Sequence, residues 1–191
     1  MMTIRNFFLF LSLLLAMSLS AQVTVRDVFK TMPHAMISYL EENSKLDFID
    51  FIDSGMKAEV TNALSGKSIM QRCTDKYLAL TLNEASQLTM RLLPVSEPVD
   101  SASQVICLVR TYGTDIRESV VSFYSVNWRQ LPASRYVSMP DGVWVASLGE
   151  SDDELTLTSD NRLNPPANKE QKVIEGKQII LKWDDGFVNK Q

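Results

Sequence analysis

The chain has 191 residues and is mildly acidic, with 19 Lys and Arg against 23 Asp and Glu. This charge balance argues against general nucleic-acid binding, which needs a basic surface. One His and two Cys are too few for a zinc site of the usual motif spacing.

Residues 1–21 have the pattern of a cleavable secretion signal. A start with one positive charge and no acid precedes an apolar stretch at residues 7–17, and small residues follow it. The apolar stretch is shorter than the roughly 20 residues that a transmembrane helix needs. We expect cleavage between Ala21 and Gln22, with cleavage after Ser20 as one alternative and an uncleaved amino-terminal anchor as another.

The remaining chain, residues 22–191, is expected to form one exported domain. The signal carries one Arg and no acid, which leaves 18 basic against 23 acidic side chains, a net charge of −5. About 170 residues suffice for one well-packed core but are few for two full domains. We therefore expect a single globular domain in the periplasm or at the cell surface, with no transmembrane segment after the signal is cleaved.

The mature chain begins with a predicted helical segment, residues 24–55. Thr24 followed by Asp27 resembles a helix N-cap with an acid in the first turn. Pro33 interrupts this helix, and a second short helix is expected at residues 33–41. Ser44 is the expected N-cap of a third helix. Its apolar face would hold Phe48, Ile49 and Ile52, its opposite face Asp47, Asp50 and Ser54, and Gly55 would end it in the left-handed conformation.

After residue 55 the pattern changes from helical spacing to alternation. Residues 76–82 and 87–93 each place alternate apolar side chains on one face, and the polar residues 83–86 between them predict a hairpin turn. Further strands are expected at residues 58–64, 68–74, 104–112, 119–128, 142–147, 154–158 and 177–183. The expected turns, rich in Gly, Pro and Asp, are residues 65–66, 94–98, 113–115, 140–142 and 184–186, with a long surface loop at residues 161–170.

These elements predict an α+β fold. A short N-terminal helical segment packs on a mostly antiparallel, curved β-sheet with meander topology. Nothing after residue 55 looks like the crossover helix that parallel strands require.

The chain offers no clear catalytic or metal site. Its single histidine, His34, follows Pro33 and has no nucleophile motif beside it, so we interpret it as an ordinary surface or core residue. The acidic clusters lie where solvated helix faces or turns are expected, and we assign no catalytic residue, metal ligand or cofactor. These clusters are residues 41–42, 47/50/53, 152–154 and 184–185, and a hydrolase that uses two carboxylates stays as a less favoured alternative.

The two cysteines, Cys73 and Cys107, leave two possibilities open. In an oxidising compartment they could pair and close a loop of about 35 residues. Cys107 lies in the apolar run VICLV, where a cysteine behaves as a small hydrophobic residue. We favour two free thiols, because nothing in the sequence brings the two residues together.

Aromatic residues of the predicted strands are the weak candidates for ligand binding. They are Tyr124, Trp128, Trp144 and Trp183. They could line a concave surface for a peptide, glycan or lipid. The alternative that we favour is that they fill the core of the sheet. A partner could also bind by adding a strand to an open sheet edge, a mode that needs no special side chains.

Two stretches resemble a known family. They are residues 51–62 and 64–68, FIDSGMKAEVTN and LSGKS, and residues 122–128, SFYSVNW. Together they resemble an uncharacterised family of exported Bacteroidetes proteins, the domain of unknown function 3256. The resemblance implies export and a single domain over nearly all of the mature chain, but no activity, cofactor or catalytic residue.

The leading functional hypothesis is a non-enzymatic interaction module of the bacterial cell envelope. It is motivated by a secreted, strand-rich domain without catalytic motifs, whose partner would be an unknown envelope protein or other component. The alternatives are a carrier of a small lipid or glycan that uses the aromatic residues, and, less favoured, the carboxylate hydrolase.

Overall fold

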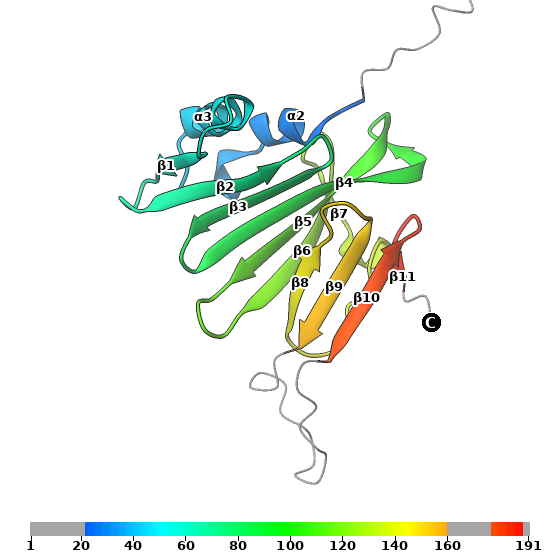
Figure 1. Ribbon diagram of the computed structural model, residues 1–191. Helices are drawn as coiled ribbons and strands as arrows, with labels where there is room; N and C mark the ends of the chain where they lie inside the picture. The colour runs from blue at the N-terminus through cyan, green and yellow to red at the C-terminus, as the bar shows by residue number, and fades with distance from the viewer. Residues whose placement is uncertain (1–21, 160–176, 189–191) are drawn as a thin grey trace, which may run out of the picture.

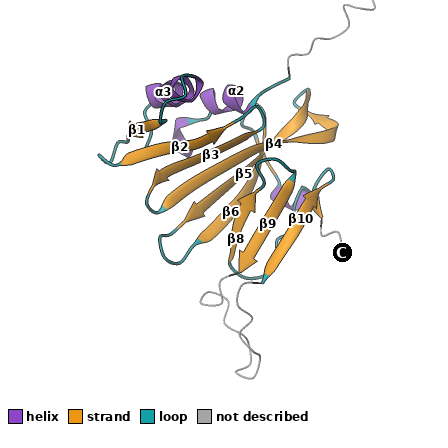
Figure 2. Cartoon of the chain, in the orientation of Figure 1, coloured by secondary structure: helices purple, strands orange, loops and turns teal. Residues whose placement is uncertain are grey.

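Three layers make up the part of the chain that this computed structural model describes, residues 22–159 and 177–188. Short helices form the first layer, a seven-stranded sheet the second and a four-stranded sheet the third (Figure 1). The strands dominate, and α2 and α3 lie together on one side of the large sheet (Figure 2). The predicted α+β class with an antiparallel sheet is confirmed. The expected signal (residues 1–21) and the loop expected at residues 161–170 lie outside the described residues.

The first helix, α2 (Val25–Lys30), begins where the sequence predicts. The Thr24 hydroxyl accepts a hydrogen bond from the Asp27 N–H, and the Asp27 carboxylate accepts one from the Thr24 N–H at 3.0 Å. This reciprocal pair is a capping box, which satisfies two N–H groups that a helix start otherwise leaves unpaired.

The two following helical predictions are only partly correct. The helix expected at residues 33–41 is a single 3-10 turn, η1 (His34–Met36), because the next residue leaves the helical conformation with φ −139°. The third helix, α3 (Glu42–Asp53), begins two residues before Ser44, which is buried inside the helix and is not its N-cap. Gly55 follows α3 with φ +66°, the left-handed conformation that the sequence predicts.

Seven strands form the large sheet as a continuous antiparallel meander. Each strand pairs with the strands before and after it in the sequence, so every connection is a short turn. The strands are β1 (Glu59–Thr61), β2 (Lys67–Cys73), β3 (Tyr77–Asn83), β4 (Ser86–Val99), β5 (Ala102–Tyr112), β6 (Glu118–Ser125) and β7 (Gln130–Leu131).

A second antiparallel sheet of four strands covers the face of the large sheet opposite the helices. Its strands are β8 (Trp144–Leu148), β9 (Glu154–Ser159), β10 (Gln178–Trp183) and β11 (Phe187–Val188), in the order β11-β10-β9-β8. The sequence predicts β8, β9 and β10 as strands but places them in one sheet with the others. After β7 the 3-10 turn η2 (Ala133–Arg135) carries the chain to the other face, and this begins the second sheet.

The central strands of the large sheet are therefore covered on both faces. The leucines that alternate along β3, Leu78, Leu80 and Leu82, pack under the helices. Tyr77 and Ala79, which alternate with these leucines, point toward the second sheet. The alternation predicted for the β3–β4 hairpin is thus confirmed, and the continuous apolar run of β5 fits a strand covered on both sides.

The tips of β4 and β5 project beyond the rest of the sheet as an arm, residues 94–104, drawn in green on the right of Figure 1. The turn predicted at residues 94–98 is wrong, because β4 continues through both prolines to Val99. Pro94 and Pro98 are exposed and flank a register irregularity, a place where a strand tolerates proline. The chain instead turns at Asp100 and Ser101, both with positive φ.

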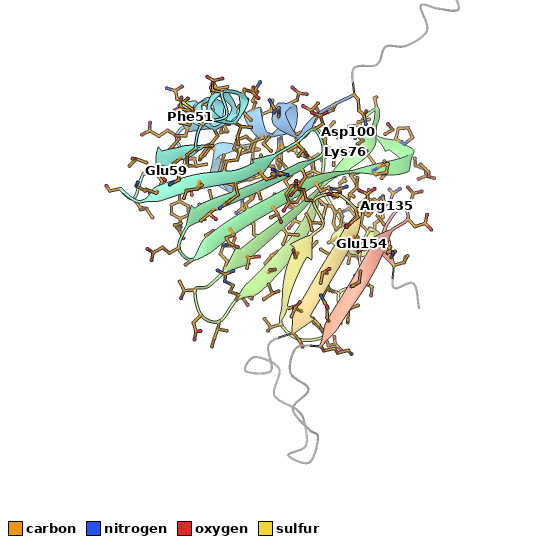
Figure 3. All side chains as sticks on the ribbon, viewed as in Figure 1. Phe51, Glu59, Lys76, Asp100, Arg135 and Glu154 are labelled. Carbon is orange, nitrogen blue, oxygen red and sulfur yellow. The ribbon has the colours of Figure 1, made fainter. Side chains whose placement is uncertain are left out.

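Polar contacts tie this arm to the rest of the molecule. Arg129 binds the Asp100 carboxylate with both Nε and Nη2, the shortest distance being 2.6 Å, and Arg135 pairs with Glu97 at 3.1 Å. The Trp183 indole donates to the Pro94 carbonyl at 2.7 Å. Figure 3 shows Asp100 and Arg135 on this side of the molecule, away from Phe51 on α3.

Lys45 joins the helices to each other, and Trp128 fastens α2 to the large sheet. The buried Lys45 ammonium donates to the carbonyls of Lys30 at 3.0 Å and Met32 at 2.9 Å, at the C-terminal end of α2. Trp128 donates its indole N–H to the Val28 carbonyl at 2.9 Å. All three bonds reach carbonyls near the end of α2, where helices leave such groups without an internal partner.

Arg91 joins the two sheets. Its buried guanidinium, on the β4 face that points to the second sheet, donates to the carbonyls of Gly149 at 3.0 Å and Glu150 at 2.7 Å. It also pairs with the Asp153 carboxylate at 2.6 Å. These contacts hold the turn between β8 and β9 against the large sheet.

Candidate functional site

The four aromatic residues proposed from the sequence do not form one surface. Tyr124 and Trp128 contact each other, with ring centroids 5.6 Å apart, and pack against the core beneath the helices. Trp144 and Trp183 belong to the core between the two sheets. The large sheet separates the two pairs, so they line no common binding surface.

The two thiols also lie apart. Cys73 belongs to the core beneath the helices and Cys107 to the core between the sheets. Both are free and buried, and burial raises the pKa of each thiol.

Several acids of the clusters noted in the sequence form ion pairs. Asp53 binds Arg26, Asp153 binds Arg91, and Glu154 binds Lys182 at 2.9 Å. His34 is exposed on η1. Within residues 22–159 and 177–188, no three His, Cys, Asp or Glu side chains are placed to hold a metal ion.

One edge of the large sheet is only partly paired in the described chain. The last strand, β7, pairs with β6 only at Phe123 and Tyr124. It stops there because Pro132, which has no N–H to donate, follows Leu131 and starts η2. Residues 118–122 of β6 therefore pair with β5 on one side, and no described strand pairs with them on the other.

The backbone direction at this edge follows from the turn that leads into β7. Ser125 donates its N–H to the Arg129 carbonyl at 2.9 Å, on the side of β7. In an antiparallel strand, alternate residues aim both backbone groups the same way. The β5–β6 register is regular throughout. Val121 and Ser119 therefore direct their N–H and C=O groups outward, away from β5, along the open edge.

Two hollows lie at the two ends of this edge. The first, of about 440 Å³, is lined by Val121 and Ser122 of β6, by the two residues of β7, and by Pro132 and Ala133. The second, of about 250 Å³, lies at the β5–β6 turn. Its lining residues are Tyr112, Gly113, Ile116, Arg117 and Glu118.

Apolar side chains are exposed along the same edge. Val120 in the middle of the open segment is 52% exposed, Ile116 before it 44%, and Tyr112 opposite its start 39%. Edge strands are normally protected by charge, proline or a bulge, because a free edge is a template for pairing with another chain. Residues 118–122 contain one charge, Glu118, and no proline or bulge. We name this surface, residues 112–122 with residues 130–133, the β6 edge.

A third hollow, of about 620 Å³, lies at the far end of β2 and β3. It is lined mainly by polar residues and glycine, among them Lys67, Thr81, Asn83 and Thr114. Its volume is within the range of small-molecule sites, but no aromatic side chain of the described residues lines it. None of the four aromatic residues proposed from the sequence lines it.

The profile of the family described as "Protein of unknown function (DUF3256)" matches residues 16–164. The chain belongs to the DUF3256 family. The resemblance seen in residues 51–68 and 122–128 is thereby confirmed, and the β6 edge lies within the matched region.

A solved structure supports the fold of this DUF3256 chain. A domain of an uncharacterized protein from Porphyromonas gingivalis W83 is similar, with a TM-score of 0.69 and 18% sequence identity over 85% of this chain and 97% of that chain. At this identity the likeness concerns the fold alone. No curated protein matches the chain. Among the described residues, no helix has both the length and the hydropathy needed to cross a bilayer.

The sequence contained part of the signal for the β6 edge. It predicted a strand over residues 119–128, which overlaps β6 but runs three residues past its end, and it named strand addition as a mode of binding. It did not predict β7, whose two residues carry no periodicity, and so the place where pairing stops was not visible. Val120 and Val121, which form the centre of the edge, were not proposed as site residues.

Proposed function

We propose that this DUF3256 chain is an exported, non-enzymatic binding module. Its partner protein in the bacterial envelope adds an extended segment to the β6 edge. The observation that carries this proposal is the run of residues 118–122, which is paired on one side only. Main-chain hydrogen bonds supply the affinity in this mode of recognition, and hollows beside the edge supply specificity.

The edge has the length and chemistry that strand addition needs. Five residues correspond to roughly 17 Å of strand, enough for a short peptide to pair along it. Ser119 and Val121 present their backbone groups to the open side, and the exposed Val120 lies between them. An added strand would satisfy those groups and cover apolar surface in one step.

The location rests on the secretion signal predicted for residues 1–21. Export would place the β6 edge in the periplasm or at the cell surface, where envelope proteins are the available partners. Amino-terminal sequencing of the protein recovered from its host cells tests this part, and a chain that begins at Gln22 is the expected result.

The first experiment replaces Val121 with proline. Proline removes an N–H that points away from β5, so the β5–β6 ladder should survive while the open edge loses a donor. A photoreactive residue at position 120, introduced in the host, should crosslink to a partner, and Val121→Pro should abolish this adduct.

Two controls make the result specific. Val121→Ile keeps the N–H and the apolar character, and should retain the adduct. A photoreactive residue at Ile180, which is 46% exposed on the second sheet, should not give the same adduct. If the adduct at position 120 persists in the folded Val121→Pro variant, the edge is not the binding site and the proposal is wrong.

A further inference from the structure

We infer that the segment bound at the β6 edge is an antiparallel strand with the pattern apolar, apolar, any residue, then Lys or Arg. This inference rests on the proposed function and adds the chemistry of the partner. It follows from the direction of β7, which lies beside β6, and from the side chain that each position of an incoming strand would meet.

The direction comes from β7. This strand runs antiparallel to β6 and pairs with its Phe123 and Tyr124, on the side where the edge is open further along. Every strand pair of the large sheet is antiparallel, and such pairs are slightly more stable per residue than parallel ones. We therefore expect an incoming strand to lie in line with β7 and to run in the same direction. Its first residue then lies beside Ser122 and its last beside Glu118.

The position opposite Val121 selects an apolar side chain. Val121 lies on the face that carries Phe123 and points toward the second sheet. A residue directly opposite it shares that face, and its side chain enters the hollow of about 440 Å³ lined by Val121, Leu131 and Ala133. Val121 is only half-buried there, so an apolar residue at this position would cover its remaining exposed surface.

The next position, opposite Val120, points to the other face of the sheet. Val120 is 52% exposed, and Arg110 lies opposite it on β5. Cross-strand neighbours of a β-branched residue contribute most when they are themselves β-branched or aromatic. The second apolar residue of the pattern covers Val120 from the open side.

The last position lies opposite Glu118. This carboxylate is exposed and has no ion pair with a described residue, and it lines the hollow at the β5–β6 turn. An opposite charge directly across two strands is favourable, whereas a like charge is unfavourable. Glu118 therefore selects Lys or Arg, in keeping with the net charge of −5 on residues 22–191.

A second copy of this chain fits the pattern poorly. In an antiparallel pair of two β6 edges centred on Val120, Ser119 would stand opposite Val121, where the pattern requires an apolar residue. Ser122 would stand opposite Glu118, where the pattern requires a base. We therefore assign the edge to a different protein that supplies such a segment.

The test is a selection from a random hexapeptide display library. The mature wild-type domain is the target, and the folded Val121→Pro variant is the counter-target. Enrichment of peptides with two adjacent apolar residues and a base two positions after them, lost with Val121→Pro, supports the inference. Replacing Glu118 with lysine should then move the preference at that position from basic to acidic residues. The change in affinity for a given peptide should be about two- to five-fold, as for an exposed ion pair.

Each other outcome is also decisive. Peptides that depend on the Val121 N–H but follow another pattern overturn the inference and leave the proposed function standing. Absence of any enrichment that Val121→Pro removes overturns both. A dimer of the wild-type domain in sedimentation analysis, dissociated by Val121→Pro, assigns the edge to a second copy and overturns the inference.

Discussion

At the scale of the residue, Trp128 shows how one side chain holds two layers together. It follows the turn that ends β6, with its N–H bonded to the Ser125 carbonyl at 2.9 Å and with φ +64°. This left-handed conformation is unfavourable for a bulky residue and is usually filled by glycine. The indole offsets that strain by packing under the helices and by donating to the Val28 carbonyl.

Replacing Trp128 with glycine tests this balance. Glycine relieves about 1 kcal/mol of backbone strain, whereas removal of a packed Trp side chain costs about 3–5 kcal/mol. We expect a net loss of about 2–4 kcal/mol in the free energy of unfolding, measured by urea denaturation. A variant as stable as the wild type would show that the ring does not fasten the helices. Trp128→Phe should fall between the two, because it keeps most of the packing and loses the N–H.

The ionisation of Asp27 makes the stability of the helical layer depend on pH. Hydrogen bonds from the Thr24 side chain, and next from the Thr24 backbone, lower the pKa of Asp27 below its ordinary value of 3.8. A carboxyl whose pKa is lower in the folded state stabilises the fold above the unfolded pKa. That contribution is lost as the pH falls through the folded pKa.

We therefore expect Asp27→Asn to destabilise the protein by about 0.5 kcal/mol at pH 7, the usual size of a charge effect at a helix start. The difference between variant and wild type should shrink as the pH falls from about 4 to 2, where Asp27 also becomes neutral. Unfolding curves at several pH values measure this difference. A constant difference across that window would contradict the role of the charge.

At the scale of the element, the turn between β8 and β9 depends on an arginine of another sheet. Arg91 is buried and satisfies two carbonyls and one carboxylate of that turn. Arg72 pairs with Glu150 of the same turn, but the Arg72 side chain is 60% exposed. The two arginines therefore form a natural comparison between a buried and an exposed contact to one element.

We expect Arg91→Ala to lower the free energy of unfolding by about 3 kcal/mol, because it leaves buried acceptors and a partly buried charge unpaired. Arg72→Ala should cost less than about 1 kcal/mol, as exposed ion pairs do. Hydrogen exchange of β8 and β9 amides should become faster in the first variant only. Equal effects of the two replacements would show that burial does not decide the strength of these contacts.

The sequence predicted elements whose signal is local. Alternation along residues 76–93 revealed the β3–β4 hairpin, and Thr24 with Asp27 revealed the start of α2. The arm at residues 94–104 was missed because Pro94 and Pro98 are typical of turns. The true turn at Asp100 and Ser101 lacks the glycine that usually marks two successive residues with positive φ.

The candidate site depends on information that is not local. Strand order and the end of β7 decide that β6 is an edge. The periodicity of residues 118–125 contains no information on either. The division into two sheets is likewise a tertiary result, since β8, β9 and β10 alternate like the other strands. Sequence reasoning could name the strands and strand addition, but not the strand that is left open.

At the scale of the whole molecule, each of the two hydrophobic cores contains one buried thiol, so thiol reactivity measures whether that core is closed. Cys107 has no exposed surface and Cys73 is 9% exposed, and burial raises the pKa of each above its ordinary value. Raised pKa values keep the reactive thiolate scarce at neutral pH. Access to both thiols requires opening of the cores on either face of the large sheet.

We expect neither cysteine to react with a thiol reagent in the folded protein at pH 8, and both to react in urea. Cys107 should be the slower of the two under mild denaturation, because it lies within β5, an interior strand of the large sheet. Mass spectrometry of the labelled chain counts the modified thiols. Rapid labelling of Cys107 without denaturant would contradict the burial described here.

The meander has a consequence for how the molecule is assembled. Each strand of the large sheet pairs with its neighbour in sequence, so the loops that must close are short and their entropic cost is small. Chains dominated by such local pairings fold faster than chains of the same size with distant pairings. If residues 22–191 emerge from the export channel with the amino terminus first, each strand of the large sheet after β1 finds its partner already present. The sheet can then grow from β1 toward β7, and within this sheet the β6 edge is completed last.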